Sequence, residues 1–224
     1  SRGEHILTVE DPIEYVFENH KSLFHQRQKG EDTKSFGNAL KAALREDPDI
    51  ILVGEMRDLE TISLAISAAE TGHLVFGTLH TNSASGTVDR IIDVFPAGQQ
   101  AQIRAMLSNS LIAVFSQTLV KKKSPKPGEF GRVMAQEIMI VTPAISNLIR
   151  EGKAAQVYSA IQTGAKMNMQ TMEQALADLI KKGIVSMEEG LAKSSRPDEL
   201  QRLADGAVGD MGMMANAKAG AKRS

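Results

Sequence analysis

The chain has 224 residues, a formal net charge of −1 and a sequence pI of about 6.5. This balance argues against a dedicated nucleic-acid or membrane-surface binder, because such proteins usually carry a basic excess. The absence of cysteine excludes disulfides and thiolate metal sites and fits a reducing cytoplasm. The longest aliphatic run, residues 50–53, is far too short to span a bilayer.

The first part of the chain alternates short apolar runs with helical periodicity. Residues 5–9 predict a buried strand that ends at Asp11-Pro12, and residues 33–46 predict a helix capped by Asp32 or Thr33. A strand, a helix and a strand follow at residues 50–53, 62–69 and 74–79. This order predicts an α/β sheet with right-handed crossovers.

The second part of the chain is expected to be mostly helical. Helices are predicted near residues 84–94 and 99–115, and a helical pattern runs from residue 143 to about 204. Two strands, 117–120 and 132–140, are joined by a loop rich in Lys, Pro and Gly.

One motif carries the strongest chemical signal. The apolar strand at 50–53 ends in Gly54-Glu55 and is flanked by charged residues on both sides. A carboxylate at the carboxyl end of a parallel strand stands where ligands bind in open α/β folds, and it can hold Mg²⁺ directly or through water. This is the logic of a Walker B strand. The simpler alternative is a capped helix start at which Glu55 and Asp58 are merely solvated.

Residues 44–58 resemble the signature of the type II secretion and type IV pilus ATPases. Three further segments support the resemblance: residues 10–15 are similar to the family's Asp box, residues 71–81 to its His box, and residues 144–151 to the C-terminal motif of the pilus retraction branch. In that last motif Ser146 replaces the usual Arg.

The resemblance implies a fold and a division of the chain. We expect a RecA-like P-loop NTPase core at residues 1–141, incomplete at its N-terminus, then a helical region at 142–204 and a disordered tail at 205–224. No Gly-x-x-x-x-Gly-Lys-Ser/Thr loop occurs in the sequence, and the chain begins with Ser1. We therefore expect a C-terminal fragment of a longer protein, inactive on its own.

The resemblance also assigns roles to acidic and basic residues. Glu14 matches the catalytic glutamate, which would orient the attacking water, and Glu55 matches the glutamate that holds Mg²⁺ through water. We expect these two side chains to meet at one rim of the sheet. Asp58 and Arg27 would contribute to nucleotide binding, although Arg27 could instead form a salt bridge.

Two histidines bracket the strand at 74–79. By resemblance, His73 contacts the γ-phosphate region as a catalytic residue, and His80 binds near the nucleotide and relays its state. Without the resemblance, either would more simply be a packed or surface residue. The coupling residues implied by the C-terminal motif are Ala144, Ile145, Asn147, Leu148, Ile149, Arg150 and Glu151.

The implied function is an ATP- and Mg²⁺-dependent homo-hexameric motor for pilus retraction and twitching motility. It would act at the cytoplasmic face of the inner membrane on a platform protein, without inserting into the bilayer and without binding nucleic acid. The lack of cysteine favours retraction, because assembly and secretion ATPases usually carry a four-cysteine zinc insertion. Those ATPases, a non-catalytic partner-binding module and a nucleic-acid translocase remain as alternatives.

Overall fold

A computed structural model describes residues 3–206 and divides them into two compact units. The first unit holds residues 3–81, 86–112 and 142–154, and the second holds 82–85, 113–141 and 155–206. These units differ from the predicted division at residue 141, because the strands at 113–141 pack with the later helices. The predicted tail at 205–224 lies outside the described residues, except that 205 and 206 end a helix beginning at 197.

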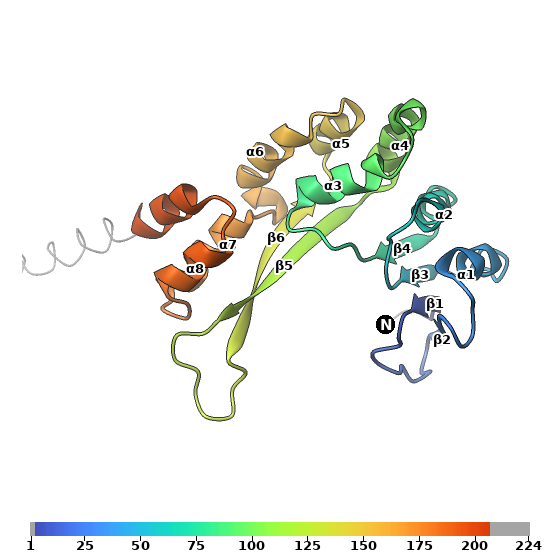
Figure 1. Cartoon of the computed structure of the whole chain (residues 1–224), viewed down its shortest axis with the longest axis horizontal. Helices are drawn as coiled ribbons and strands as arrows, with labels where there is room; N and C mark the ends of the chain where they lie inside the picture. The colour runs from blue at the N-terminus through green and yellow to red at the C-terminus, as the bar shows by residue number, and fades with distance from the viewer. Residues whose placement is uncertain (1–2, 207–224) are drawn as a thin grey trace, which may run out of the picture. The chain divides into compact units, whose positions relative to one another are not determined.

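The first unit is built on a four-stranded parallel sheet in the order β2-β1-β3-β4 (Figure 1). Its strands are β1 (His5–Glu10), β2 (Leu23–Gln28), β3 (Ile50–Val53) and β4 (Leu74–Gly77). The predicted strands are confirmed, but β2 was not predicted. Its mostly polar sequence lacks an apolar run, and only pairing with β1 makes it a strand.

Two helices cover one face of this sheet. Helix α1 (Phe36–Ala43) and helix α2 (Leu59–Glu70) contact each other and pack on the side chains of β1 and β3. The buried strand residues of this core are Leu7, Val9, Ile51 and Val53. The predicted cap of α1 was wrong: Ser35 caps the helix by accepting a hydrogen bond from the Asn38 amide at 3.1 Å.

Three further helices belong wholly or partly to the first unit. They are α3 (Ala84–Asp93), α4 (Ala97–Ser110) and α5 (Pro143–Arg150), and α4 packs on α5 and α2. The predicted helix 99–115 was too long, because its last residues pair with Ile138 and Ile140 in a strand. An apolar, partly β-branched run such as 111–115 suits either structure, and the long-range pairing decides.

The second unit is a two-stranded hairpin covered by helices. Strands β5 (Ala113–Lys121) and β6 (Arg132–Ile140) are antiparallel, with Ala113 opposite Ile140. Its helices are α6 (Val157–Gln162), α7 (Met172–Lys181), α8 (Met187–Lys193), the 3₁₀ turn η2 (Ala165–Met167) and the helix 197–206. A further 3₁₀ turn, η1 (Ala154–Gln156), joins α5 to this unit.

Helices α7 and α8 pack on the hairpin around Val120, Leu176 and Leu200. Among residues 3–206, no helix combines the length and apolarity needed to cross a membrane.

Candidate functional site

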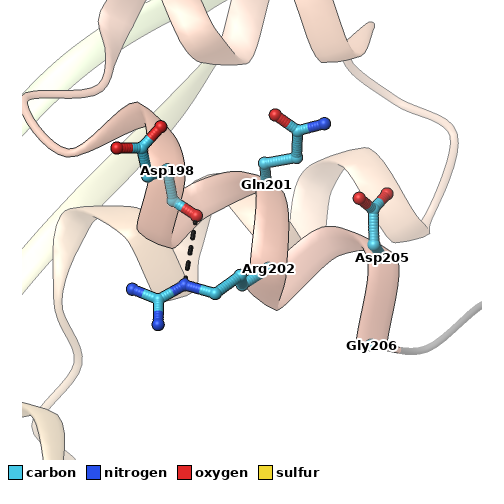
Figure 2. Close-up of a pocket in the computed structure, with 5 residues that line it drawn as sticks. All are labelled: Asp198, Gln201, Arg202, Asp205 and Gly206. Carbon is cyan, nitrogen blue, oxygen red and sulfur yellow. Dashed lines mark hydrogen bonds between the residues drawn. The ribbon is translucent and has the colours of Figure 1, made fainter.

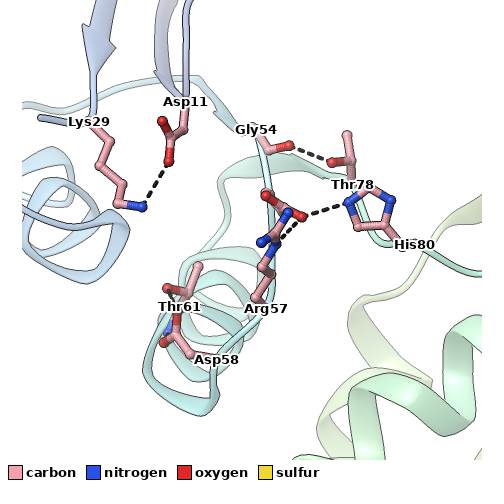
Figure 3. Close-up of polar contacts among 9 residues, drawn as sticks. Asp11, Lys29, Gly54, Arg57, Asp58, Thr61, Thr78 and His80 are labelled. Atoms are coloured by element: carbon pink, nitrogen blue, oxygen red, sulfur yellow. Dashed lines mark hydrogen bonds and ion pairs between the residues drawn. The ribbon is translucent and has the colours of Figure 1, made fainter.

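The carboxyl ends of β1, β3 and β4 are tied together by backbone hydrogen bonds. The amide of Gly54 donates to Val9 O at 2.7 Å, and the amide of Met56 donates to Thr78 O at 3.0 Å. Thr78 also donates its hydroxyl to the carbonyl of Gly54 (Figure 3). The residues that follow these strands therefore start from one fixed edge of the sheet.

Gly54 is required at this edge for steric reasons. A Cβ added there would lie 2.9 Å from Val9 O and 3.1 Å from Glu10 Cα. Both atoms belong to the backbone of a core strand and cannot move aside cheaply. The glycine thus allows β3 to end tightly against β1, and Glu55 leaves the sheet from that point.

Glu55 binds two basic side chains at the edge. Its Oε1 accepts a hydrogen bond from Arg57 Nε and lies 2.6 Å from His80 Nε2. The Glu55 side chain is 18% exposed, whereas those of Arg57 and His80 are 73% and 82% exposed. The hydrogen bond from Arg57 lowers the pKa of Glu55; desolvation opposes this, and His80 lowers the pKa further. The structure thus unites the Walker B-like glutamate with the second histidine of the His box-like segment.

Asp58 lies near Glu55 in sequence, but its carboxylate is hydrogen-bonded to Thr61. One of its carboxylate oxygens accepts the amide of Thr61 and the other accepts the Thr61 hydroxyl, both at 2.8 Å. It is the N-cap of α2, which gives it a structural role, and its role in nucleotide binding stays a prediction. The Asp-x-x-Thr spacing was the available signal.

Glu14 is exposed and lies in the loop after β1. Its neighbours are bonded to β2: the Ile13 amide donates to Gln28 Oε1 at 3.0 Å, and Tyr15 O accepts from Gln26 Nε2 at 2.9 Å. Strand β2 flanks β1 on the side opposite β3. Both glutamates thus follow carboxyl ends of neighbouring strands, and the expected meeting of their side chains stays a prediction. The loop after β1 is hydrogen-bonded to β2.

Glu10 is a residue that the sequence analysis passed over. It ends β1, is 9% exposed, and accepts hydrogen bonds from the Thr8 hydroxyl at 2.6 Å and from Gln26 Nε2 at 3.1 Å. Beyond it, Asp11 pairs with Lys29 at 2.8 Å (Figure 3). The sequence signal for the burial of Glu10 was its position as the last residue of a buried strand.

Arg27 forms a salt bridge, which is the simpler of the two alternatives predicted for it. Its Nη2 lies 2.6 and 2.8 Å from the two carboxylate oxygens of Glu46, with both side chains largely covered. It lines a shallow depression together with Phe24, His25, Gln26, Asp32 and Glu46. Its charge is therefore already paired in this chain.

His73 lies at the amino end of the parallel strands, whereas Glu55 lies at their carboxyl end. It precedes β4, where the amide of Leu74 donates to Asp49 O, and its Nδ1 is 3.0 Å from Ala68 O. Because β3 and β4 are parallel with Leu74 opposite Ile50, the residue before β4 and the residue after β3 lie five residues apart along the strands, on the order of 17 Å. The structure thus separates His73 from Glu55 along the strands, and the expected contact of His73 with the γ-phosphate region stays a prediction.

The C-terminal motif forms α5, and its residues divide by burial. Ile145 and Ile149 are core residues, at most 1% exposed, while Ser146 donates its hydroxyl to Ser108 O at 2.6 Å. Arg150 donates to Asn109 Oδ1 at 3.0 Å. Leu148 is half-buried, and the side chains left exposed for a partner are those of Ala144, Asn147, Arg150 and Glu151.

A separate shallow pocket lies on the helix 197–206 (Figure 2). There Arg202 Nε donates to the carbonyl of Asp198 at 3.4 Å. The lining residues lie outside every predicted motif, so we assign this pocket no part in the site.

A parallel α/β sheet with an acidic residue at the carboxyl end of an apolar strand is the architecture of RecA-like P-loop ATPases. The family model described as "Type II/IV secretion system protein" matches residues 1–192. The chain belongs to this family.

Curated relatives and solved structures narrow the comparison. The chain is 61% identical to the type IV pilus retraction ATPase PilT of Pseudomonas aeruginosa, over 88% of this chain and 56% of that protein. It is 55% identical to the twitching motility protein of Neisseria gonorrhoeae, over 88% of this chain and 51% of that protein. It matches the crystal structure of the pilus retraction motor PilT with bound ADP at a TM-score of 0.81 and 56% identity, over 89% of this chain and 55% of that one. The chain therefore spans about half the length of these relatives.

Proposed function

We propose that this chain supplies the Walker B and His-box part of an ATP-hydrolysing motor that powers type IV pilus retraction. The contact of Glu55 with His80 at the carboxyl edge carries the proposal, because it joins two nucleotide-sensing segments at the edge where α/β sheets bind ligands. Similarity to two proteins named for pilus retraction and twitching motility supports this particular motor.

Glu55 is the residue that would hold Mg²⁺ of bound ATP through a water molecule. Its carboxylate is ionised and reaches solvent at the sheet edge, which suits a hydrated Mg²⁺. Among residues 3–206 no group of three potential metal-ligating side chains occurs, so phosphate oxygens and water would complete the coordination. Mg²⁺ would supply charge neutralisation of the transferred phosphoryl group.

The remaining edge residues would respond to the nucleotide. Arg57 and His80 are mostly exposed and hold Glu55 through their side chains, so phosphates can compete for them. Glu14 would orient the attacking water once its exposed loop moves toward β3. His73, at the other edge, would act on a neighbouring subunit or by positioning β4.

The whole-protein properties form part of the proposal. We infer a homo-hexamer that works at the cytoplasmic face of the inner membrane against a platform protein. A phosphate-binding loop is needed for turnover, because its backbone amides and lysine hold the phosphates. The 224 residues contain no such loop, so we expect them to hydrolyse no ATP when isolated.

The decisive experiment measures phosphate release by the isolated chain and by a longer protein that adds a phosphate-binding loop. In the longer protein, Glu55→Gln should lower kcat by about 100-fold or more, since it removes charge that acts on the transition state. Glu60→Gln is the matched control, because Glu60 is an exposed carboxylate paired only with Lys41 at 2.5 Å. Full activity in Glu55→Gln, or turnover by the isolated chain, would refute the proposal.

A second function, partner binding without catalysis, is favoured by the outer face of the hairpin. Phe115, Leu119 and Met134 are 61%, 53% and 45% exposed on the face that α7 and α8 leave uncovered. Replacing Phe115 and Leu119 with Ser should weaken assembly and leave the fold intact. Assembly that needs no nucleotide and survives Glu55→Gln would favour this function over the motor.

A further inference from the structure

Glu137 is a carboxylate buried in the middle of β6. It is 3% exposed, and burying a charged group costs free energy unless its oxygens are hydrogen-bonded. Oε1 accepts the amide of Ala84 at 2.7 Å, and Oε2 accepts the amide of Met172 at 3.4 Å. Both oxygens thus bind backbone rather than side chains.

Ala84 and Met172 are the first residues of α3 and α7. Amides in the first turn of a helix lack a partner inside the helix, and a helix N-terminus favours negative charge. A single carboxylate therefore satisfies the starts of two helices that lie far apart in sequence. All three residues belong to the second unit.

The start of α3 has a special place in the chain. Residues 82–85 belong to the second unit, whereas the residues on both sides belong to the first. In the first unit the hydroxyls of Thr81 and Thr87 lie 2.6 Å apart. His80, which contacts Glu55, immediately precedes Thr81. The bond from Ala84 to Glu137 thus attaches to the second unit a segment that begins at the carboxyl edge of the sheet.

We propose that Glu137 is a positioning residue that fixes the segment from His80 to Ala84 and links it to α7. Ala84 follows His80 by four residues, so holding Ala84 shortens the free chain that connects His80 to a fixed point. The catalytic part of this inference rests on the proposed function, whereas the clamp itself does not.

The surroundings of Glu137 provide a matched control. Glu173 is 0% exposed in the same unit, but it accepts the hydroxyls of Tyr158 at 3.1 Å and Ser194 at 2.9 Å. Burial raises the pKa of Glu137 above its usual value; the two backbone hydrogen bonds oppose this, Glu173 adds to it, and Arg196 lowers it. Glu173 is thus equally buried without touching α3.

The first test is amide hydrogen exchange in the 224-residue chain. Glu137→Gln keeps one oxygen and loses one acceptor, so exchange at Ala84 or Met172 should accelerate about tenfold or more. Glu173→Gln should leave Ala84 unchanged. Unaltered exchange in Glu137→Gln, or equal acceleration at Ala84 by Glu173→Gln, would show that Glu137 is no clamp.

A measurement without a variant covers the case in which Glu137→Gln does not fold. In the wild-type chain, the NMR shifts of the Ala84 and Met172 amide protons should follow the titration of the Glu137 carboxyl carbon. Amide shifts that stay constant through that titration would overturn the clamp.

The second test concerns turnover in the longer protein with its phosphate-binding loop. Glu137→Gln should lower kcat about tenfold per folded molecule, with KM for ATP within about twofold of wild type, because Glu137 does not touch nucleotide. An unchanged kcat in the variant would overturn the positioning role. If the wild type itself hydrolyses no ATP, the proposed function fails, and the exchange data still decide on the clamp.

Discussion

Two carboxylates of this chain sit in opposite physical environments. Glu55, at the edge of the first unit, is held by side chains that are mostly exposed, and those partners lower its pKa. Glu137, inside the second unit, is held by two backbone amides, and burial raises its pKa. A carboxylate with exposed side-chain partners can exchange them for a ligand, whereas one bound to backbone fixes the fold.

The largest effect is expected from removing the buried carboxylate of Glu137, which tests whether this group fixes the fold. Glu137→Ala leaves the amides of Ala84 and Met172 without their acceptor, which should reduce the free energy of unfolding by about 2–4 kcal/mol. Urea denaturation of the 224-residue chain measures this loss. Glu60→Ala, at an exposed position, should change it little; equal losses in both variants would mean that burial of Glu137 has no special weight.

A smaller loss is expected at the edge from crowding the end of β3. Gly54→Ala places a methyl group against the backbone of Val9 and Glu10, which should cost about 1–3 kcal/mol. Gly98→Ala is a suitable control, because nothing lies within 4 Å of a Cβ added there. Thermal denaturation compares the two. A Gly54→Ala chain as stable as wild type would show that the strand end yields easily.

Substitutions of Asp58 test whether this residue stabilises the fold as an N-cap or binds nucleotide. Asp58→Ala removes the N-cap of α2 and should cost about 1 kcal/mol in urea denaturation. Asp58→Ser, which also caps, should restore most of that stability. If Asp58→Ser remained as unstable as Asp58→Ala while nucleotide binding fell in both, a ligand role for Asp58 would replace the structural one.

The smallest effects are expected in the pH dependence of stability. The lowered pKa of Glu55 contributes stability above the ordinary value of 4.5, and this is lost as the pH falls through the folded pKa. The raised pKa of Glu137 has the opposite sign: relative stability is greatest below 4.5 and declines as the pH rises through the folded pKa. Denaturation between pH 3 and pH 8 should show Glu55→Gln flattening the acid side and Glu137→Gln removing the decline. The same slope change in both variants would contradict the opposite signs.

Local sequence determined much of the first unit. The strands at 5–10, 50–53 and 74–77 and the helix that ends at Thr71-Gly72 follow from apolar periodicity and turn residues, which depend only on near neighbours. The placement of Glu55 just after a strand followed from the same pattern, because the residues that follow a parallel strand emerge at its carboxyl end.

Tertiary structure alone decided the features that depend on pairing across the chain. Strand β2 exists because it pairs with β1, and residues 113–115 are strand because they pair with β6. The loop after β1 is hydrogen-bonded to β2, and the parallel sheet puts His73 at the amino end of the strands. The bonds of Glu137 join residues far apart in sequence. Such choices are made by hydrogen bonds and burial that form only when distant segments meet, so no local pattern records them.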